Sequence, residues 1–148
     1  MDKQPLQILL AEDDESDRLN FKEALAESKI HTIVHTVNDG VELMEYLSIE
    51  INQLPDLLFL DLNLPRKNGL ECLKEIKAHV RLRDISIAIY STSSSETDIE
   101  ETFRSGANVY IKKPNDFGLL KESLDRVVRD AKQYQEPPYN KSFFLLRV

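Results

Sequence analysis

The chain of 148 residues has the length of one ordinary domain, and its hydrophobic share of 41% fills a single core rather than two. Its formal net charge of −7 argues against a nucleic-acid partner, because phosphate-backbone binding requires a basic surface. One cysteine cannot form an internal disulfide, and with three scattered histidines it makes no zinc-type cluster. No apolar run approaches the ~18 residues of a membrane span, and the N-terminus has no cleavage-site pattern. We therefore expect a soluble, cytoplasmic protein that does not enter a membrane.

Short apolar runs alternate with segments of helical periodicity, which is typical of a parallel sheet with crossover helices. Five strands are predicted, at residues 6–11, 32–37, 56–60, 86–90 and 108–111. The segments between and after them carry apolar residues at helical spacing and predict five helices. The sequence therefore predicts an α/β fold with a doubly wound, five-stranded parallel sheet in the strand order 2-1-3-4-5.

Polar side chains gather where four of these strands end. They are Glu12 and Asp13 after the first strand, Asp61 after the third, Ser91 and Thr92 after the fourth, and Lys113 after the fifth. The carboxyl ends of parallel strands meet at one edge, so the three carboxylates are expected in one pocket, where they suit the hard cation Mg²⁺. A carboxylate nucleophile, a metal, a lysine and a hydroxyl are the groups that phosphoryl transfer requires. The pattern predicts a phosphorylation site.

Each of these residues alone has a plainer structural interpretation. Asp61 could cap a helix, Glu12 and Asp13 could belong to an acidic first helical turn, and Ser91 could be a loop hydroxyl. Lys113 beside Lys112 could be a solvated charge, and a lone strand tyrosine is usually a half-buried packing residue. The joint placement of an acid pair, an acid, a hydroxyl and a lysine at the ends of the appropriate strands favours function.

Four motifs contain these residues: residues 9–14 (LLAEDD), 61–65 (DLNLP) followed by Asn-Gly at 68–69, 91–93 (STS), and 112–114 (KKP). They resemble the receiver domain of two-component response regulators, the CheY-like family with a flavodoxin-like fold, and the resemblance runs from about residue 6 to residue 132. It implies a receiver domain at residues 1–134. It also implies the following roles: Asp61 as phosphoacceptor; Glu12, Asp13 and the carbonyl of Asn63 as Mg²⁺ ligands together with Asp61; Ser91, Thr92 and Lys113 as phosphoryl-binding residues; and Tyr110 as the switch aromatic.

The sequence departs from the usual family pattern at three places. The acid pair is Glu-Asp rather than two aspartates, Ser91 replaces a commoner threonine, and Thr92 replaces a small residue. The larger Thr92 side chain is expected to affect access to Asp61 and so the rates of phosphorylation and dephosphorylation, but not the site itself.

The implied function is that of a single-domain response regulator, similar to those paired with phytochrome-type or hybrid sensor kinases. It would accept a phosphoryl group from a histidine kinase or phosphotransfer protein and switch its interaction surface, as a signalling domain rather than an enzyme. The sequence names neither the kinase nor the downstream target. Three alternatives remain: a phosphatase of the haloacid-dehalogenase type, which needs a second acid where Asn63 stands; a flavin or nucleotide carrier; and a scaffold that works without phosphorylation.

The bond between Lys113 and Pro114 is expected to be cis. It directly follows a strand, beside a site where the lysine must point inward, and proline lowers the intrinsic cost of the cis isomer.

Residues 135–148 lie outside the five-unit scheme and form a C-terminal extension. Pro137 and Pro138 interrupt the helix before them, and an apolar run of strand-like length follows at residues 143–148. Such a run should be buried, because in water it would favour aggregation. Two placements are open: an arm that joins two protomers in a homodimer, which the stiff prolines favour, or a tail packed on its own fifth helix.

Overall fold

The protein is described here from a computed structural model, which covers residues 4–138 and 140–146. Five parallel strands form one sheet in the order β2-β1-β3-β4-β5, as predicted. The strands are β1 (Leu6–Ala11), β2 (Thr32–Val37), β3 (Leu57–Leu60), β4 (Ser86–Ser91) and β5 (Val109–Lys112). The predicted boundaries differ from these by at most one residue at either end.

Helices connect the strands and follow the last one. They are α1 (Glu15–Ala26), α2 (Gly40–Ser48), α3 (Gly69–Ala78), α4 (Glu96–Arg104), α5 (Phe117–Arg129), the 3₁₀ helix η1 (Ala131–Tyr134) and α6 (Lys141–Phe144). Each of the first five begins after a residue whose side chain accepts a hydrogen bond from the backbone N–H three positions later: Asp14, Asp39, Asn68, Ser95 and Asp116. These N-caps satisfy backbone donors that the first helical turn leaves free.

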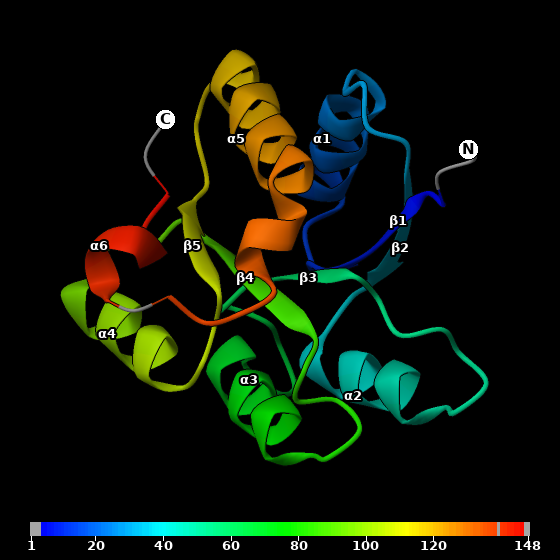
Figure 1. The fold of residues 1–148 in the computed structure, drawn as a ribbon, viewed down its shortest axis with the longest axis vertical. Helices are drawn as coiled ribbons and strands as arrows, with labels where there is room; N and C mark the ends of the chain where they lie inside the picture. The colour runs from blue at the N-terminus through cyan, green and yellow to red at the C-terminus, as the bar shows by residue number, and fades with distance from the viewer. Residues whose placement is uncertain (1–3, 139, 147–148) are drawn as a thin grey trace.

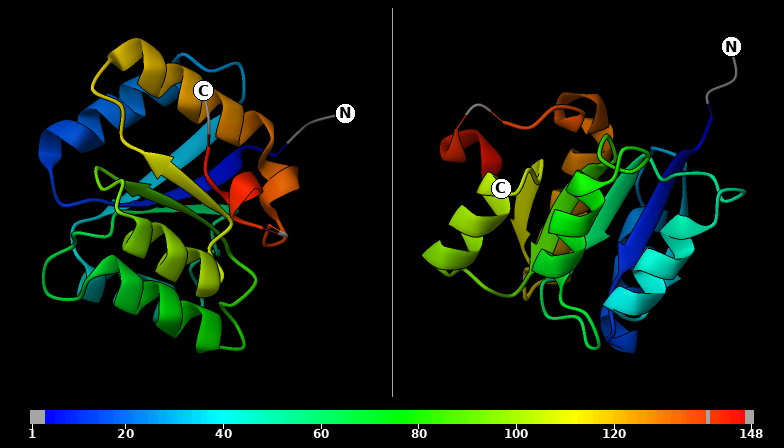
Figure 2. Two further views of the ribbon diagram at one scale, coloured as in Figure 1. Left: turned by 90° about the vertical axis from the view of Figure 1, so that its left-hand side faces the viewer. Right: turned by 90° about the horizontal axis from the view of Figure 1, so that it is seen from below.

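The helices lie in two layers around the sheet. α1 and α5 cover one face, and α2, α3 and α4 cover the other (Figures 1 and 2). β3 and β4 lie inside the sheet and are buried at every position, as expected for strands covered on both faces. On the α1–α5 side the ring of Phe21 meets the ring of Phe59 at 4.9 Å, edge to face, and both side chains are fully buried.

The C-terminal extension folds back onto its own domain. Of the apolar run expected at residues 143–148, the first two residues end a short helix, α6, which Asn140 caps through a hydrogen bond from the Ser142 N–H, and the last two lie outside the described residues. Phe144 is fully buried, whereas Phe143 is 68% exposed. α6 lies against α4 and β5, on the opposite side of β5 from the fifth helix (Figures 1 and 2). A homodimer remains a prediction.

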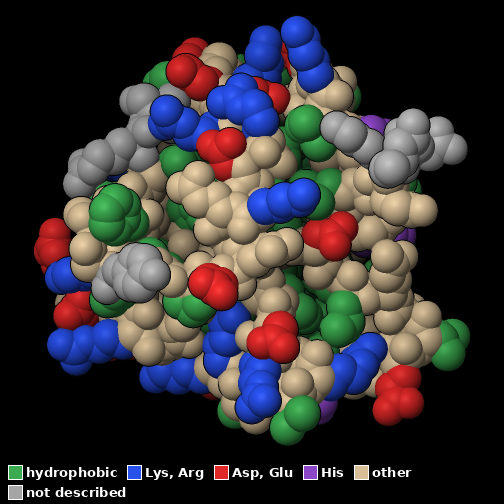
Figure 3. All heavy atoms as spheres, viewed as in Figure 1, with side chains coloured by type: hydrophobic (Ala, Val, Ile, Leu, Met, Phe, Trp, Pro, Cys, Tyr) green, Lys and Arg blue, Asp and Glu red, His purple; other side chains and the backbone are tan. Residues whose placement is uncertain are grey.

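The surface carries both signs of charge. Figure 3 shows basic and acidic side chains interspersed on the face that bears α5, with hydrophobic atoms in separate small groups. Within the described part of the chain, no helix is long and apolar enough to cross a bilayer.

Candidate functional site

The predicted site residues meet at the carboxyl edge of the sheet. Glu12 directly follows β1, Asp61 directly follows β3, and Lys113 directly follows β5. The backbone N–H of Asp61 donates to the Ala11 carbonyl at 3.2 Å, and that of Lys113 donates to the Ser91 carbonyl at 2.8 Å. The sheet's hydrogen bonding therefore extends one residue past these strands, which places the functional side chains on rigid backbone.

Lys113 is the centre of the site. Its Nζ donates to Glu12 Oε1 in a close ion pair, to Asp61 Oδ2 at 3.2 Å and to Asp17 Oδ2 at 3.1 Å. The Lys113 side chain is only 10% exposed, and Glu12 and Asp61 are buried beside it. One ammonium group thus joins the ends of three elements: β1, β3 and the first turn of α1.

The carboxylates outnumber the positive charge. Burial raises the pKa of Glu12 to about 7, and the charge of Asp61 adds to this effect against the opposing influence of Lys113. For Lys113, burial opposes the charged form, but its hydrogen bond to the Glu12 carboxylate and the charge of Asp61 outweigh this effect and raise the pKa of Lys113 above the ordinary value. Four acidic side chains, Glu12, Asp13, Asp17 and Asp61, therefore gather around one ammonium group, and a further cation would favour their charged forms.

The donor set fits a hard divalent cation. Carboxylate oxygens of Glu12, Asp13 and Asp61 all lie within 4.8 Å of one another, and Asp13 is exposed while the other two are buried. Oxygen ligands on an open pocket are those that Mg²⁺ and Mn²⁺ prefer, since such ions keep part of their water shell. These residues, predicted from the ends of two strands, could hold a metal ion.

The loop after β3 fixes the Asp61 carboxylate. The backbone N–H of Asn63 donates to Asp61 Oδ1 at 3.0 Å, while Asp61 Oδ2 accepts from Lys113. Gly69 packs against this loop so closely that a Cβ there would lie 2.3 Å from the Asp61 carbonyl oxygen. Its N–H donates to the Leu62 carbonyl at 3.0 Å. Asn68 and Gly69 of the sequence motif therefore have separate tasks: Asn68 caps α3, and Gly69 allows the close approach.

The predicted switch residues lie along β4 and β5. Ser91 is buried at the end of β4, and its Oγ accepts from the Ser93 N–H at 3.2 Å. Tyr110 on β5 is fully buried, and its hydroxyl donates to the Ser93 carbonyl at 2.8 Å. Thr92 is exposed. Ser93 thus connects the predicted hydroxyl and the predicted aromatic through its backbone.

Sequence reasoning missed two contacts and was wrong about one bond. Asp17 reaches Lys113 from the first turn of α1, and the Tyr90 ring lies 5.1 Å from Lys113 Nζ, within the range of a cation–π contact. The acidic run after β1 was a signal for Asp17, although the run alone does not show which acid turns inward.

No cis peptide bond occurs in the described chain, so the bond between Lys113 and Pro114 is trans. The trans isomer is intrinsically favoured even before proline, and Lys113 reaches Asp61 with it.

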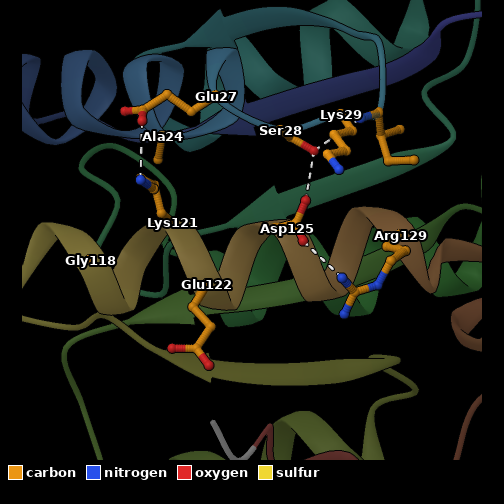
Figure 4. Close-up of a pocket in the computed structure, with 10 residues that line it drawn as sticks. Ala24, Glu27, Ser28, Lys29, Gly118, Lys121, Glu122, Asp125 and Arg129 are labelled. Carbon is orange, nitrogen blue, oxygen red and sulfur yellow. Dashed lines mark hydrogen bonds and ion pairs between the residues drawn. The ribbon is translucent and has the colours of Figure 1, made fainter.

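A separate groove lies between α1 and α5, with a volume of about 420 Å³. Figure 4 shows Lys121 paired with Glu27 across it, and Asp125 between Ser28 and Arg129. These pairs tie the end of α1 to α5 and contain none of the predicted site residues.

The geometry agrees with the comparisons to known proteins. The sequence model of the response regulator receiver domain matches residues 8–125. The chain therefore belongs to the receiver-domain family of two-component response regulators. It is 32% identical to a probable methanogenesis regulatory protein, FilR2 of Methanothrix harundinacea, over 88% of this chain and 83% of that protein. It is 35% identical to the response regulator Rcp1 of Synechocystis, over 74% and 77% respectively.

Solved structures give the same fold. The phosphorylated cyanobacterial phytochrome response regulator RcpA superposes with a TM-score of 0.81 at 36% identity, covering 87% of this chain and 95% of RcpA. The Mn²⁺-bound form of Rcp1 superposes with a TM-score of 0.76 at 32% identity, covering 83% and 91%. The protein is thus a CheY-like response regulator of two-component signalling, a class whose receiver domains accept phosphoryl groups from histidine kinases.

Proposed function

We propose that this protein accepts a phosphoryl group on Asp61 and changes its interaction surface in response. The observation that carries the proposal is the position of the Asp61 carboxylate, 3.2 Å from Lys113 Nζ and clustered with the carboxylates of Glu12 and Asp13. A nucleophile, a fixed cation and a set of metal ligands in one pocket are the parts that phosphoryl transfer needs.

Mg²⁺ is the metal that we propose for this pocket. Glu12, Asp13 and Asp61 would hold it through carboxylate oxygens, with the Asn63 carbonyl as a further ligand. Bound there, Mg²⁺ would supply positive charge to the oxygens of the transferring group. The cluster of three carboxylates, all offering oxygen ligands, supports this assignment, and so does the Mn²⁺-bound form of the relative Rcp1.

The proposed reaction transfers the phosphoryl group from a phosphohistidine of a kinase or phosphotransfer protein in the cytoplasm. An Asp61 carboxylate oxygen forms a bond to phosphorus, the phosphorus–nitrogen bond breaks, and its electron pair stays on the imidazole nitrogen. Lys113 already pairs with Asp61 Oδ2 and would bind a phosphoryl oxygen in the product. Asn63 holds the other carboxylate oxygen, so the nucleophile is oriented before the donor arrives.

The proposed response begins at Ser91. Its hydroxyl would donate to a phosphoryl oxygen, with Thr92 beside it at the exposed end of β4. Ser91 contacts the Ser93 backbone, and Ser93 contacts Tyr110. A movement of Ser91 toward the phosphoryl group would therefore change the loop before α4. A local charge that shifts a loop between two arrangements is an established way to alter a binding surface.

Phosphorylation by a small donor tests the proposal. The protein is incubated with acetyl phosphate and Mg²⁺, and its intact mass is measured. We expect a gain of one phosphoryl group in the wild type, and no gain either when a chelator of Mg²⁺ is present from the start of the incubation or in Asp61→Asn. An unchanged mass, or equal labelling of the Asn variant, would overturn the proposal.

A further inference from the structure

The C-terminal extension is seated on the switch tyrosine. Phe144 is fully buried, with its ring 5.9 Å from the ring of Tyr110 and 5.5 Å from that of Phe103. Beyond α6, Leu145 forms a parallel bridge with Tyr110, and the Leu146 N–H donates to the Tyr110 carbonyl at 2.9 Å. The extension therefore contacts both the ring and the backbone of Tyr110.

An ion pair adds to this attachment from α4. Lys141 Nζ lies 3.0 Å from Glu100 Oε2, so the start of α6 is fixed to the helix that follows the Ser91–Ser95 loop. Phe103, the other partner of Phe144, is on the same helix. α6 thus contacts both α4, the helix that follows the loop after Ser91, and β5, the strand that carries Tyr110 (Figure 2).

The far end of Tyr110 reaches toward the site. Its hydroxyl donates to the Ser93 carbonyl, and the Ser93 N–H donates to Ser91 Oγ. A continuous series of direct contacts therefore joins Phe144 to the hydroxyl that we propose for phosphoryl binding.

We infer that Phe144 is a positioning residue for phosphoryl binding, which it supports by holding Tyr110 inward under the loop; this inference rests on the proposed function. The Phe144 ring packs against the fully buried Tyr110 ring and so supports the position in which the Tyr110 hydroxyl donates to the Ser93 carbonyl. Removal of the Phe144 ring would leave a cavity beside Tyr110, into which the tyrosine side chain could turn. The Ser93 backbone would then lose its bond to the Tyr110 hydroxyl and would no longer hold the Ser91 hydroxyl in place. The pre-organised site binds more tightly because less ordering is needed on binding.

Coupling of this kind is reciprocal. If seating of the extension strengthens phosphoryl binding, a phosphoryl group at Asp61 must strengthen the seating by the same factor. The extension would then be held more firmly on α4 and β5 in the phosphorylated protein. Its residues, including the exposed Phe143, would form part of the surface presented in that state.

Binding of beryllium fluoride, a stable mimic of the phosphoryl group, tests the inference. Its affinity in the presence of Mg²⁺ is measured by titration calorimetry on the full chain. We expect Phe144→Ala to weaken binding by roughly 5- to 150-fold, the usual range for coupled sites. Phe143→Ala is the matched control, because it removes the same side chain from the adjacent, exposed position, and it should leave the affinity unchanged.

A second variant separates positioning from loss of structure. Phe144→Leu keeps most of the buried apolar volume, and thermal unfolding shows whether each variant is folded at the titration temperature. Among folded variants we expect the affinity to decrease in the order wild type, Leu, Ala. Equal or tighter binding by folded Phe144→Ala would overturn the inference.

Hydrogen exchange at the Leu146 amide tests the reciprocal effect. We expect beryllium fluoride with Mg²⁺ to slow this exchange in the wild type and to leave it unchanged in Asp61→Asn. Exchange that is unaffected in the wild type, although the mimic binds, would contradict the coupling. Failure of the proposed function looks different, because the wild type itself would then bind no beryllium fluoride.

Discussion

Lys113 Nζ lies 3.2 Å from Asp61 Oδ2, although the two residues are 52 positions apart in the chain. They meet because Asp61 directly follows β3 and Lys113 directly follows β5. Parallel strands present their carboxyl ends at the same edge of the sheet. The contact is fixed by the topology of the sheet rather than by local sequence.

Replacement of this lysine should slow phosphorylation. Lys113→Met keeps the apolar stem but removes the charge that faces Asp61. We expect the rate of labelling by acetyl phosphate with Mg²⁺ to fall on the order of 10²-fold, the size of effect seen when one electrostatic donor is removed from a reacting centre. Lys112→Met is the control, because Lys112 is exposed at the preceding position. Equal rates for Lys113→Met and the wild type would show that the ammonium group takes no part.

Gly69→Ala should destabilise the protein and disturb Asp61. The added Cβ would lie 2.3 Å from the Asp61 carbonyl oxygen and 2.8 Å from Leu62 Cα, so the loop after β3 must move. Urea denaturation should show a loss of about 1–3 kcal/mol, the usual cost of such overpacking. In Gly118→Ala the new Cβ meets only a carboxylate oxygen of Asp116 at 3.1 Å, and the change should stay within about 1 kcal/mol. Similar losses in both variants would refute the close-approach explanation.

The aromatic cluster under α1 should be a major source of stability. Phe21 is fully buried, 4.9 Å from Phe59 and 5.7 Å from Tyr90 between ring centroids. Phe21→Ala should cost about 3–5 kcal/mol in the free energy of unfolding. Leu19→Ala on the same helix, where the side chain is 54% exposed, should change it by less than about 0.5 kcal/mol. A loss below about 1 kcal/mol for Phe21→Ala would contradict the packing described here.

The buried thiol of Cys72 should be unreactive in the folded protein. Burial raises its pKa from an ordinary 9.0 to about 11, so at pH 8 the reactive thiolate is much rarer in the folded chain than in the unfolded one. A chromogenic disulfide reagent at pH 8 should modify Cys72 at least about tenfold more slowly without urea than with it. Val80→Cys in a Cys72→Ala background places a thiol at a position that is 77% exposed and should react rapidly. Comparable rates for the two thiols in folded protein would mean that Cys72 is accessible.

The sheet and the centre of the site could be predicted from the sequence because they depend on strong, repeated signals. Buried parallel strands are nearly continuous apolar runs, and the residue after each strand lies at one edge. Glu12, Asp13, Asp61 and Lys113 follow directly from those two facts, and the structure brings them together.

The remaining features depend on geometry that sequence patterns do not encode. Whether Asp17 reaches Lys113 depends on how the first turn of α1 is rotated, and Tyr90 joins them only because of the pleat of β4. The extension was expected to be a strand-like arm or a partner of the fifth helix. Within its described residues, Asn140 instead caps a short helix at residues 141–144, and Phe144 is buried beside Tyr110, against α4 and β5.

The most direct test of the account is to locate the phosphoryl group in the chain. The protein is labelled with acetyl phosphate and Mg²⁺, the acyl phosphate is reduced with borohydride, and the modified residue is identified by peptide mass spectrometry. We predict modification at Asp61 alone, the carboxylate held by both Lys113 and the Asn63 N–H. Modification at Asp13 or Asp17, with Asp61 unmodified, would contradict the assignment of Asp61 as the phosphoacceptor.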